Sequence, residues 1–449
     1  MTESNRDYLA EYDSAPEAEK YPLVHKWMKT EPLPFFKQLR EERPILVTPE
    51  CTLVTLFTDV RDVLQMPKVF TVDLYKPKMG VTATDPGYLM AHDDDALHYR
   101  EKSLMQGMLN RDDVPKVRKF VARCAEGLLD DADGSIEVVN AYCRRVPAHL
   151  VRDYFGLDGI GLDELIEWSF WNQYDAFHNQ PFDLNSTEKY EHIVKNHDRV
   201  TEELVTYIAV LMGRKLLRVR TEFITNILLL PWRLIKALFR RLTGREDDAV
   251  GDTIVLRMLR SSFAKKVDFS LIRIGVNAGG LLIGAIETTS QAVVQTIRYF
   301  LDRPDLLNDA KHAAADGNPT AFDSMVWEAL RFVPISPYMF RRASTDYAIA
   351  KGTDRETEIE RGTNVLLVTQ SAIFDPYAFD DPEEFDPYRN WYHHFNFGFG
   401  SHECLGKYIG MVMIPEMVRQ VILRHNIRAT GPMDYKDGPF PEDYPLAWG

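Results

Sequence analysis

The sequence predicts a mainly helical protein with small β-sheets, folded as a single domain over residues 1–449. Helical patterns follow one another across residues 115–301, with little of the alternation that marks strands. Strand-like stretches are confined to two regions, 44–70 and 347–369. No stretch is rich enough in Pro, Gly or Ser to form a linker, so one large domain is expected.

Composition narrows the class of protein further. Hydrophobic residues make up 45% and charged residues 27%, as in soluble enzymes with a sizeable core. The net charge of -14 argues against nucleic-acid binding, which requires a basic surface. Residues 1–20 are acidic and polar, so we expect a flexible N-terminal segment without an export signal. The four cysteines form no CxxC pair, which favours the reducing cytoplasm over a disulfide framework.

The two strand-like regions carry clear turn signals. In the first, two apolar stretches flank a turn near Pro49, and a short helical pattern begins at Asp59. This order predicts a hairpin that leads into a helix. In the second region, Gly352 and Gly362 mark the turns between strands.

A long central helix is predicted over residues 267–302. At 1.5 Å per residue it would be about 54 Å long, enough to cross a whole domain. Arg273, Asn277 and Glu287 interrupt its apolar character, which makes it a poor candidate for a lipid-spanning segment. We therefore expect a buried helix at the centre of the fold.

A glycine-rich loop precedes the last helical pattern, and residues 397–406 read FGFGSHECLG. Gly398 and Gly400 lack Cβ and tolerate positive φ, so the backbone can closely approach a flat cofactor. Cys404 stands just before a helix start, where amide N–H groups and the helix dipole lower the pKa of a thiol. The loop therefore predicts a thiolate ligand for haem iron. Phe397 would shield the sulfur from water.

This run resembles the cysteine signature of the cytochrome P-450 family. The residues that match the signature are Phe397, Gly398, Gly400, Cys404 and Gly406. Together with further motifs in the family's order, the resemblance extends over residues 44–428. It implies a triangular fold with haem b between the central helix and the helix after Cys404. Cys404 would be the axial ligand of the iron, and Gly406 would let the following helix lie against the macrocycle.

The central helix contains a second motif, GAIETT at residues 284–289, which is similar to the family's oxygen-activation motif. Gly284 and Thr288 share a helix face, so the small residue leaves space for dioxygen beside the hydroxyl. Thr288 is expected to hydrogen-bond the oxygen, and Glu287 to relay protons from solvent. In an ordinary helix, the Thr would bond to the preceding turn and the Glu would be solvated.

A third motif resembles the family's ExxR. Glu328 and Arg331 share a helix face, and Arg389 in the downstream segment 381–389 is expected to complete a charged cluster beneath the cysteine loop. The expected role is structural. An isolated ExxR is a common surface ion pair and says little about function. It supports the resemblance here because it stands in the family's order and spacing relative to Cys404.

Four basic side chains match positions that hold the haem propionates in the family: His98, Lys102, Arg341 and His402. Most family members have Arg where this chain has Lys102, and lysine keeps the charge without bidentate geometry. Each of the four is otherwise an ordinary solvated cation. The candidate pocket residues are Leu281, Gly284, Ala285, Ile335 and Ser336.

A basic, apolar segment lies between Arg214 and Arg245, with nine basic residues and one acidic residue. Around Trp232 and Phe239 the apolar residues recur at helical spacing, with the cations on other faces. By resemblance, this region precedes the central helix and lids the substrate entrance. Peripheral contact with a membrane surface and simple packing on the protein are both open.

The predicted function is insertion of one oxygen atom from O2 into a lipophilic substrate, such as a fatty acid, terpenoid or sterol-like molecule. Thiolate ligation favours cleavage of the O–O bond. Electrons would come from a separate ferredoxin or flavodoxin-type donor with its reductase, since no such module fits in the chain. A peroxide-driven peroxygenase and a non-enzymatic haem ligand-binding protein are the alternatives.

Overall fold

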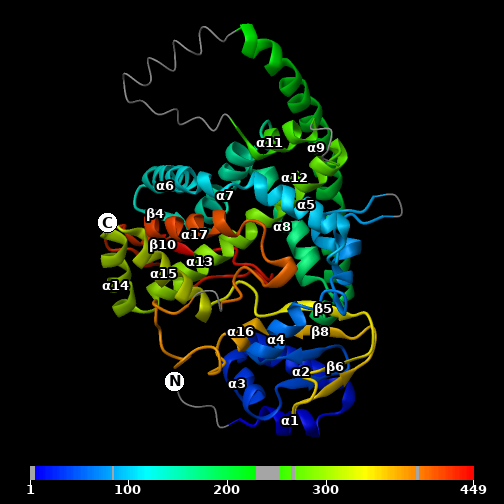
Figure 1. Cartoon of the computed structure of the whole chain (residues 1–449). Helices are drawn as coiled ribbons and strands as arrows, with labels where there is room; N and C mark the ends of the chain where they lie inside the picture. The colour runs from blue at the N-terminus through cyan, green and yellow to red at the C-terminus, as the bar shows by residue number, and fades with distance from the viewer. Residues whose placement is uncertain (1–5, 83–84, 229–251, 264–267, 391–393) are drawn as a thin grey trace.

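The computed structural model describes residues 6–82, 85–228, 252–263, 268–390 and 394–449, and it is mainly helical with small sheets (Figure 1). The helices are α1 Tyr8–Ser14, α2 Glu17–Thr30, α3 Pro32–Glu42, α4 Phe57–Leu64, α5 Ala96–Met108, α6 Val114–Asp131, α7 Arg145–Leu150, α8 Leu162–His178, α9 Thr187–Leu228, α11 Ile254–Ser262, α12 Leu271–Ala285, α13 Glu287–Leu301, α14 Pro304–Ala315, α15 Pro319–Phe332, α16 Thr369–Ala372 and α17 Lys407–Ile422. The strands are β1 Ile45–Val47, β2 Thr52–Val54, β3 Phe70–Thr71, β4 Ser135–Glu137, β5 Met339–Ala343, β6 Tyr347–Ile349, β7 Thr357–Ile359, β8 Asn364–Leu367, β9 Arg428–Ala429 and β10 Pro445–Ala447.

The largest described sheet has the strand order β1-β2-β8-β5-β3. Its first two strands form the predicted hairpin, with Ile45 opposite Val54, and α4 follows directly. β2 pairs in parallel with β8, which joins segments far apart in the sequence into one sheet. The second strand-like region is also confirmed, because β6 and β7 pair around the turn at Gly352 and Gly362 precedes β8 with φ +93°.

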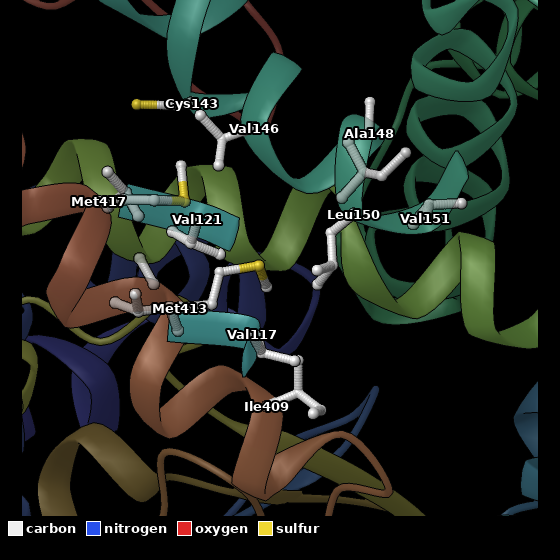
Figure 2. Close-up of a cluster of buried hydrophobic side chains, with 14 of the residues drawn as sticks. Val117, Val121, Cys143, Val146, Ala148, Leu150, Val151, Ile409, Met413 and Met417 are labelled. Carbon is white, nitrogen blue, oxygen red and sulfur yellow. The ribbon is translucent and has the colours of Figure 1, made fainter. Parts of the chain in front are cut away.

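The helical core is built where α6 lies along α17. Figure 2 shows Val117 and Val121 of α6 pointing toward Ile409 and Met413 of α17. All four side chains are buried in the main hydrophobic cluster. Because α17 follows the cysteine loop directly, this packing fixes the loop against the body of the protein.

Within the N-terminal segment that was expected to be flexible, Tyr8–Ser14 form the helix α1. Tyr8, Leu9 and Tyr12 of α1 are buried, and the Tyr8 ring packs edge-on against Trp27 at 5.3 Å between centroids. The overall acidic composition of this segment gave no sign of the helix, because its few apolar residues are spaced so that they fall on one side of it. Residues 1–5 lie outside the described residues.

The central helix is present but interrupted. It runs from Leu271 to Leu301 with a break at Ile286, between α12 and α13. By length and composition it is the one helix among the described residues that could cross a membrane, and 61% of its most apolar window is buried in the fold. Burial within the protein accounts for its apolar character, as predicted.

The long helix α9 extends beyond the body of the protein at its C-terminal end (Figure 1). Two cations of the basic segment, Arg214 and Lys215, both bind the carboxylate of Asp158. Most of the predicted amphipathic helix, including Trp232 and Phe239, lies outside the described residues.

Candidate active site

A cavity of about 1560 Å³ occupies the centre of the molecule, and both Cys404 and Thr288 lie on its wall. The cysteine loop, α12, α13 and the segment 334–341 contribute to this wall. All five predicted pocket residues line it: Leu281, Gly284, Ala285, Ile335 and Ser336. Further walls come from α8 and α9, which the sequence did not indicate because they carry no motif. The described part of the basic segment contributes only Leu216, and none of its cations, to the lining.

The cysteine loop has the backbone that its glycines predict. Gly398 and Gly400 both have positive φ, +72° and +73°. A Cβ at Gly400 would stand 2.9 Å from the carbonyl oxygen of Leu64, so the loop passes tightly over the end of α4. The N–H of Cys404 donates to the carbonyl of Phe397 at 2.7 Å, which closes the loop and presents the sulfur to the cavity.

Phe397 and Gly410 lie in close contact. A Cβ at Gly410 would meet the Phe397 ring at 3.0 Å, and the ring also packs against Trp327, at 5.3 Å between centroids. Gly406 leaves room beside the sulfur, since its Cβ would lie 3.9 Å from Cys404 Sγ. Gly410 was missed in the sequence because it lies inside a helical pattern, four residues after the signature.

The pKa of Cys404 is raised above its ordinary value, contrary to the lowering expected from its place before a helix. Cys404 is exposed to the cavity, but desolvation by the surrounding wall disfavours the thiolate, and this effect outweighs the hydrogen bond from the Gly406 N–H and the charge of Lys102. The helix start therefore lowers the pKa of Cys404 as predicted, but desolvation raises it by more. A metal ion at the sulfur would deprotonate it outright.

The break in the central helix lies at the predicted oxygen-activation motif. Thr288 lines the cavity, and its hydroxyl donates to the Gly284 carbonyl at 2.6 Å. Gly284 leaves open space, because a Cβ there would meet nothing within 4 Å. The last carbonyls of a helix lack partners in their own helix, so the hydroxyl satisfies one of them at the end of α12.

Glu287 does not line the cavity and is not solvated, which departs from the expected relay to bulk solvent. Its side chain is fully buried and accepts two hydrogen bonds from Arg144, at 2.9 Å and 3.1 Å. Arg144 also bonds Glu442 at 3.1 Å, whose side chain is 21% exposed. Among the described residues, Arg144 links the buried carboxylate of Glu287 to Glu442 near the surface. Arg144 is a functional candidate that no sequence spacing links to Glu287.

The ExxR residues form a buried charged cluster with the downstream segment. Arg331 donates to Glu328 at 2.8 Å and also to the carbonyl of Glu384 at 3.0 Å. Arg389 donates to Glu328 at 3.3 Å and to the carbonyl of Asp381 at 2.7 Å. The structure therefore brings Glu328, Arg331 and Arg389 together, where they hold the segment that leads into the cysteine loop.

Of the predicted propionate-binding residues, His402 and Arg341 line the cavity, while His98 does not line it but contacts His402. The rings of His98 and His402 lie 4.9 Å apart, and Arg341 lines the cavity beside them. Burial, followed by the charge of Arg341, lowers the pKa of His402 to about 2. Both ring nitrogens of each histidine are buried without a hydrogen-bond partner among the described residues. Buried polar atoms of this kind indicate a missing partner, and the carboxylates of a haem fit that need.

Lys102 has a different environment from the one expected. Its ammonium group donates to the carbonyls of Ser401 and Glu403, the latter at 2.8 Å. Lys102 therefore holds the backbone on the N-terminal side of Cys404 and does not line the cavity. The carboxylate of Glu403 forms an ion pair with Lys407 at 2.5 Å, so its charge is balanced by a cation.

Comparison with known proteins agrees with this geometry. The family model "Cytochrome P450" matches residues 174–437. Cytochrome P450 NovI of Streptomyces niveus is 36% identical over 138 residues, which are 31% of this chain and 31% of NovI. Putative cytochrome P450 YjiB of Bacillus subtilis is 22% identical over 84% of this chain and 82% of its own length.

Solved structures share the fold over nearly the whole chain. CYP109E1 from Bacillus megaterium, solved with testosterone, has a TM-score of 0.72 at 18% identity, covering 93% of this chain and 98% of its own. P450BioI, solved with an acyl carrier protein that carries hexadec-9Z-enoic acid, has a TM-score of 0.73 at 17% identity, covering 94% and 99%. Because the family model matches more than half of the chain, this protein belongs to the cytochrome P450 family.

Proposed function

We propose that the protein is a haem-thiolate monooxygenase that inserts one oxygen atom from O2 into a lipophilic substrate, working as a single catalytic domain. The observation that carries this proposal is the placement of Cys404 and Thr288 on one central cavity. One comes from a loop built to present a sulfur, and the other from the interrupted turn of the central helix. Family membership implies the haem cofactor.

The residues present fit haem b. Cys404 would bind the iron, His98, His402 and Arg341 would face the propionates, and Phe397 would pack beneath the sulfur. Haem bound in this way supplies the redox chemistry that activates dioxygen, with the thiolate favouring cleavage of the O–O bond. Gly398 and Gly406 would allow the loop and α17 to lie close to the macrocycle.

Thr288 and Glu287 are proposed to handle protons. The Thr288 hydroxyl now donates to the Gly284 carbonyl, and it faces the open space where dioxygen would bind. By turning from that carbonyl, Oγ can donate its proton into the cavity. Glu287 would replenish the proton when its ion pair with Arg144 opens, because the closed pair is buried away from the cavity.

The substrate is proposed to be a lipophilic molecule of the fatty acid, terpenoid or sterol-like class. Apolar residues such as Leu281, Ala285 and Ile335 support this class, and the cavity is large enough for such molecules. Relatives of the same fold were solved with testosterone and with a fatty acid carried by an acyl carrier protein. A screen of lipophilic compounds for shifts in the haem absorption spectrum tests this proposal directly.

Electrons are proposed to come from a separate ferredoxin or flavodoxin-type protein with its reductase, in the cytoplasm. Lys407 balances the negative charge of Glu403 beside Cys404. This pairing lowers the electrostatic repulsion of an acidic electron donor that docks near the cysteine loop. Turnover should require O2 and this electron supply. Product formation with peroxide alone, at a rate equal to that with the donor, would favour a peroxygenase instead.

Peripheral membrane contact through residues 214–245 is retained as a separate proposal, and the sequence alone supports it. Arg214 and Lys215 form ion pairs with Asp158. Membrane contact would therefore depend on the later cations of the segment and on Trp232 and Phe239. Flotation with anionic vesicles at low salt tests it. Equal flotation of the wild type and a Trp232→Glu, Phe239→Glu variant would overturn it.

A further inference from the structure

Two side chains of α8 bond to the interrupted turn of the central helix, which we define as residues 283–288. The hydroxyl of Ser169 donates to the Ile283 carbonyl at 3.0 Å, and the Gln173 side-chain amide donates to the same oxygen at 2.6 Å. Both side chains are buried, at 0% and 2% exposure. A carbonyl that receives two buried donors from another helix is held in a defined position.

The position of Ile283 explains why these bonds matter. It lies in the last turn of α12, where carbonyl groups have no partner within their own helix. The next carbonyl, that of Gly284, accepts the Thr288 hydroxyl. Two successive carbonyls of the interrupted turn are therefore bonded by side chains. Without the donors from α8, the Ile283 carbonyl would be free to accept the N–H of Glu287 and restore a regular helix.

We propose that Ser169 and Gln173 are positioning residues for the oxidation, because they hold the interrupted turn open and thereby keep Thr288 on the cavity wall. The proposal rests on the proposed function of Thr288. Gln173 also lines the cavity, so the same side chain touches the space that substrate would fill and the turn that would receive dioxygen. Gln173 therefore links the wall of the cavity to this turn.

The alternative is that these bonds only attach α8 to α12. The two roles differ in what they predict for a variant that removes both donors, Ser169→Ala with Gln173→Met. Simple attachment predicts lower stability with unchanged use of electrons. Positioning predicts that the turn itself changes and that reducing equivalents are diverted into hydrogen peroxide.

The test uses the purified haem-loaded protein. A matched control is Gln180→Met, which also removes a buried glutamine donor, here to the Ala176 carbonyl within the same helical region, without reaching α12. Ser169→Thr keeps the hydroxyl and serves as the conservative variant. Amide hydrogen exchange over residues 283–290 reports the turn, and the ratio of product to peroxide reports its consequence.

In the double variant, we expect exchange of the Glu287 amide to slow roughly five-fold, as one net hydrogen bond is gained. Peroxide released per product should rise about ten-fold. The control and Ser169→Thr should resemble the wild type. Adding Thr288→Ala to the double variant should give the same peroxide release as Thr288→Ala alone, because all three changes act on one turn.

Unchanged exchange over residues 283–290 would overturn the positioning role, even if activity fell. If exchange changed but the ratio of product to peroxide stayed at the wild-type value, α8 would hold the turn without governing oxidation, and the positioning role would be wrong. Absence of the red-shifted band of the reduced carbon monoxide complex in the wild type would instead defeat the proposed function. Hydrogen exchange would still decide whether α8 holds the turn.

Discussion

Arg144 and Glu287 form a buried ion pair, with Arg144 Nε and Nη2 donating to the two carboxylate oxygens at 2.9 Å and 3.1 Å. The pair joins the segment before α7 to the first turn of α13, directly beside Thr288. Arg144 also bonds Glu442 near the surface. The acid of the predicted oxygen-activation motif therefore lies away from the cavity, and we propose that it exchanges protons when this ion pair opens.

Removal of Arg144 should make stability depend more strongly on pH. Burial raises the pKa of Glu287 above its ordinary value, and Arg144 opposes that rise. In Arg144→Met the pKa rises further, so the folded state binds a proton that the unfolded state releases, and stability falls as pH increases between the two pKa values. We expect a loss of about 3–5 kcal/mol near pH 8 and a smaller loss near pH 5.

Denaturant unfolding at the two pH values measures this difference. Arg424→Met provides the control, because its partner Asp130 is 60% exposed and the pair should contribute less than about 1 kcal/mol at either pH. An equal loss at both pH values in Arg144→Met would contradict the account of Glu287.

Replacement of Thr288 by Ala should uncouple electron use from product formation. The variant keeps the cavity and the thiolate but lacks the hydroxyl that faces the dioxygen space, so haem and substrate should bind as in the wild type. We expect product per electron consumed to fall roughly ten-fold to a hundred-fold, with hydrogen peroxide released in its place, as for loss of a proton-transfer group.

Thr296→Ala is the matched control for this prediction. Thr296 lies in the same helix and donates to the Ala292 carbonyl at 2.7 Å, but it does not line the cavity. A product-to-electron ratio equal to wild type in Thr288→Ala, or the same loss in both variants, would refute the proposed role of Thr288.

Lys102 should be needed to keep the cysteine loop in place. Lys102→Met leaves two loop carbonyls without their charged donor, which we expect to destabilise the protein by about 1.5–3 kcal/mol. The fraction of protein with the red-shifted carbon monoxide band should fall in parallel. Lys102→Arg should retain most of both properties, and Lys116→Met, whose side chain is 80% exposed, should change neither. If Lys102→Met showed the red-shifted carbon monoxide band at the wild-type fraction, the lysine would not be needed to hold the cysteine loop.

The Glu328 cluster should be among the most sensitive points for stability. Glu328→Gln leaves the guanidinium of Arg331 buried without its counter-charge, and such a loss typically destabilises by about 3–5 kcal/mol. Glu17→Gln, in an exposed pair with Lys20, should lie within about 0.5 kcal/mol of the wild type. Chemical unfolding compares the two, and near-equal values would show that the cluster is not structural.

Sequence reasoning reached those features whose geometry is local to a motif. The positive φ of Gly398 and Gly400 follows from the loop sequence, because residues with Cβ avoid that conformation. The hairpin before α4 follows from two apolar stretches around a turn. Glu328 and Arg331 lie three residues apart on one helix, so their contact needed no knowledge of the fold.

Features that depend on distant contacts could not be predicted in this way. Arg144 and Glu287 are 143 residues apart, and Ser169 bonds a carbonyl 114 residues away. No periodicity or spacing links such positions. The raised pKa of Cys404 was missed for the same reason, because burial by the whole cavity wall outweighs the local helix start.

The central claim is that Cys404 supplies a thiolate to haem iron, and the spectrum of the reduced, carbon monoxide-bound protein tests it most directly. The wild type should show the red-shifted Soret band of thiolate ligation, and Cys404→Ala should abolish it. Cys51→Ala and Cys143→Ala should keep the band, because both cysteines are buried away from the cavity lining. A band that persists unchanged in Cys404→Ala would contradict the account.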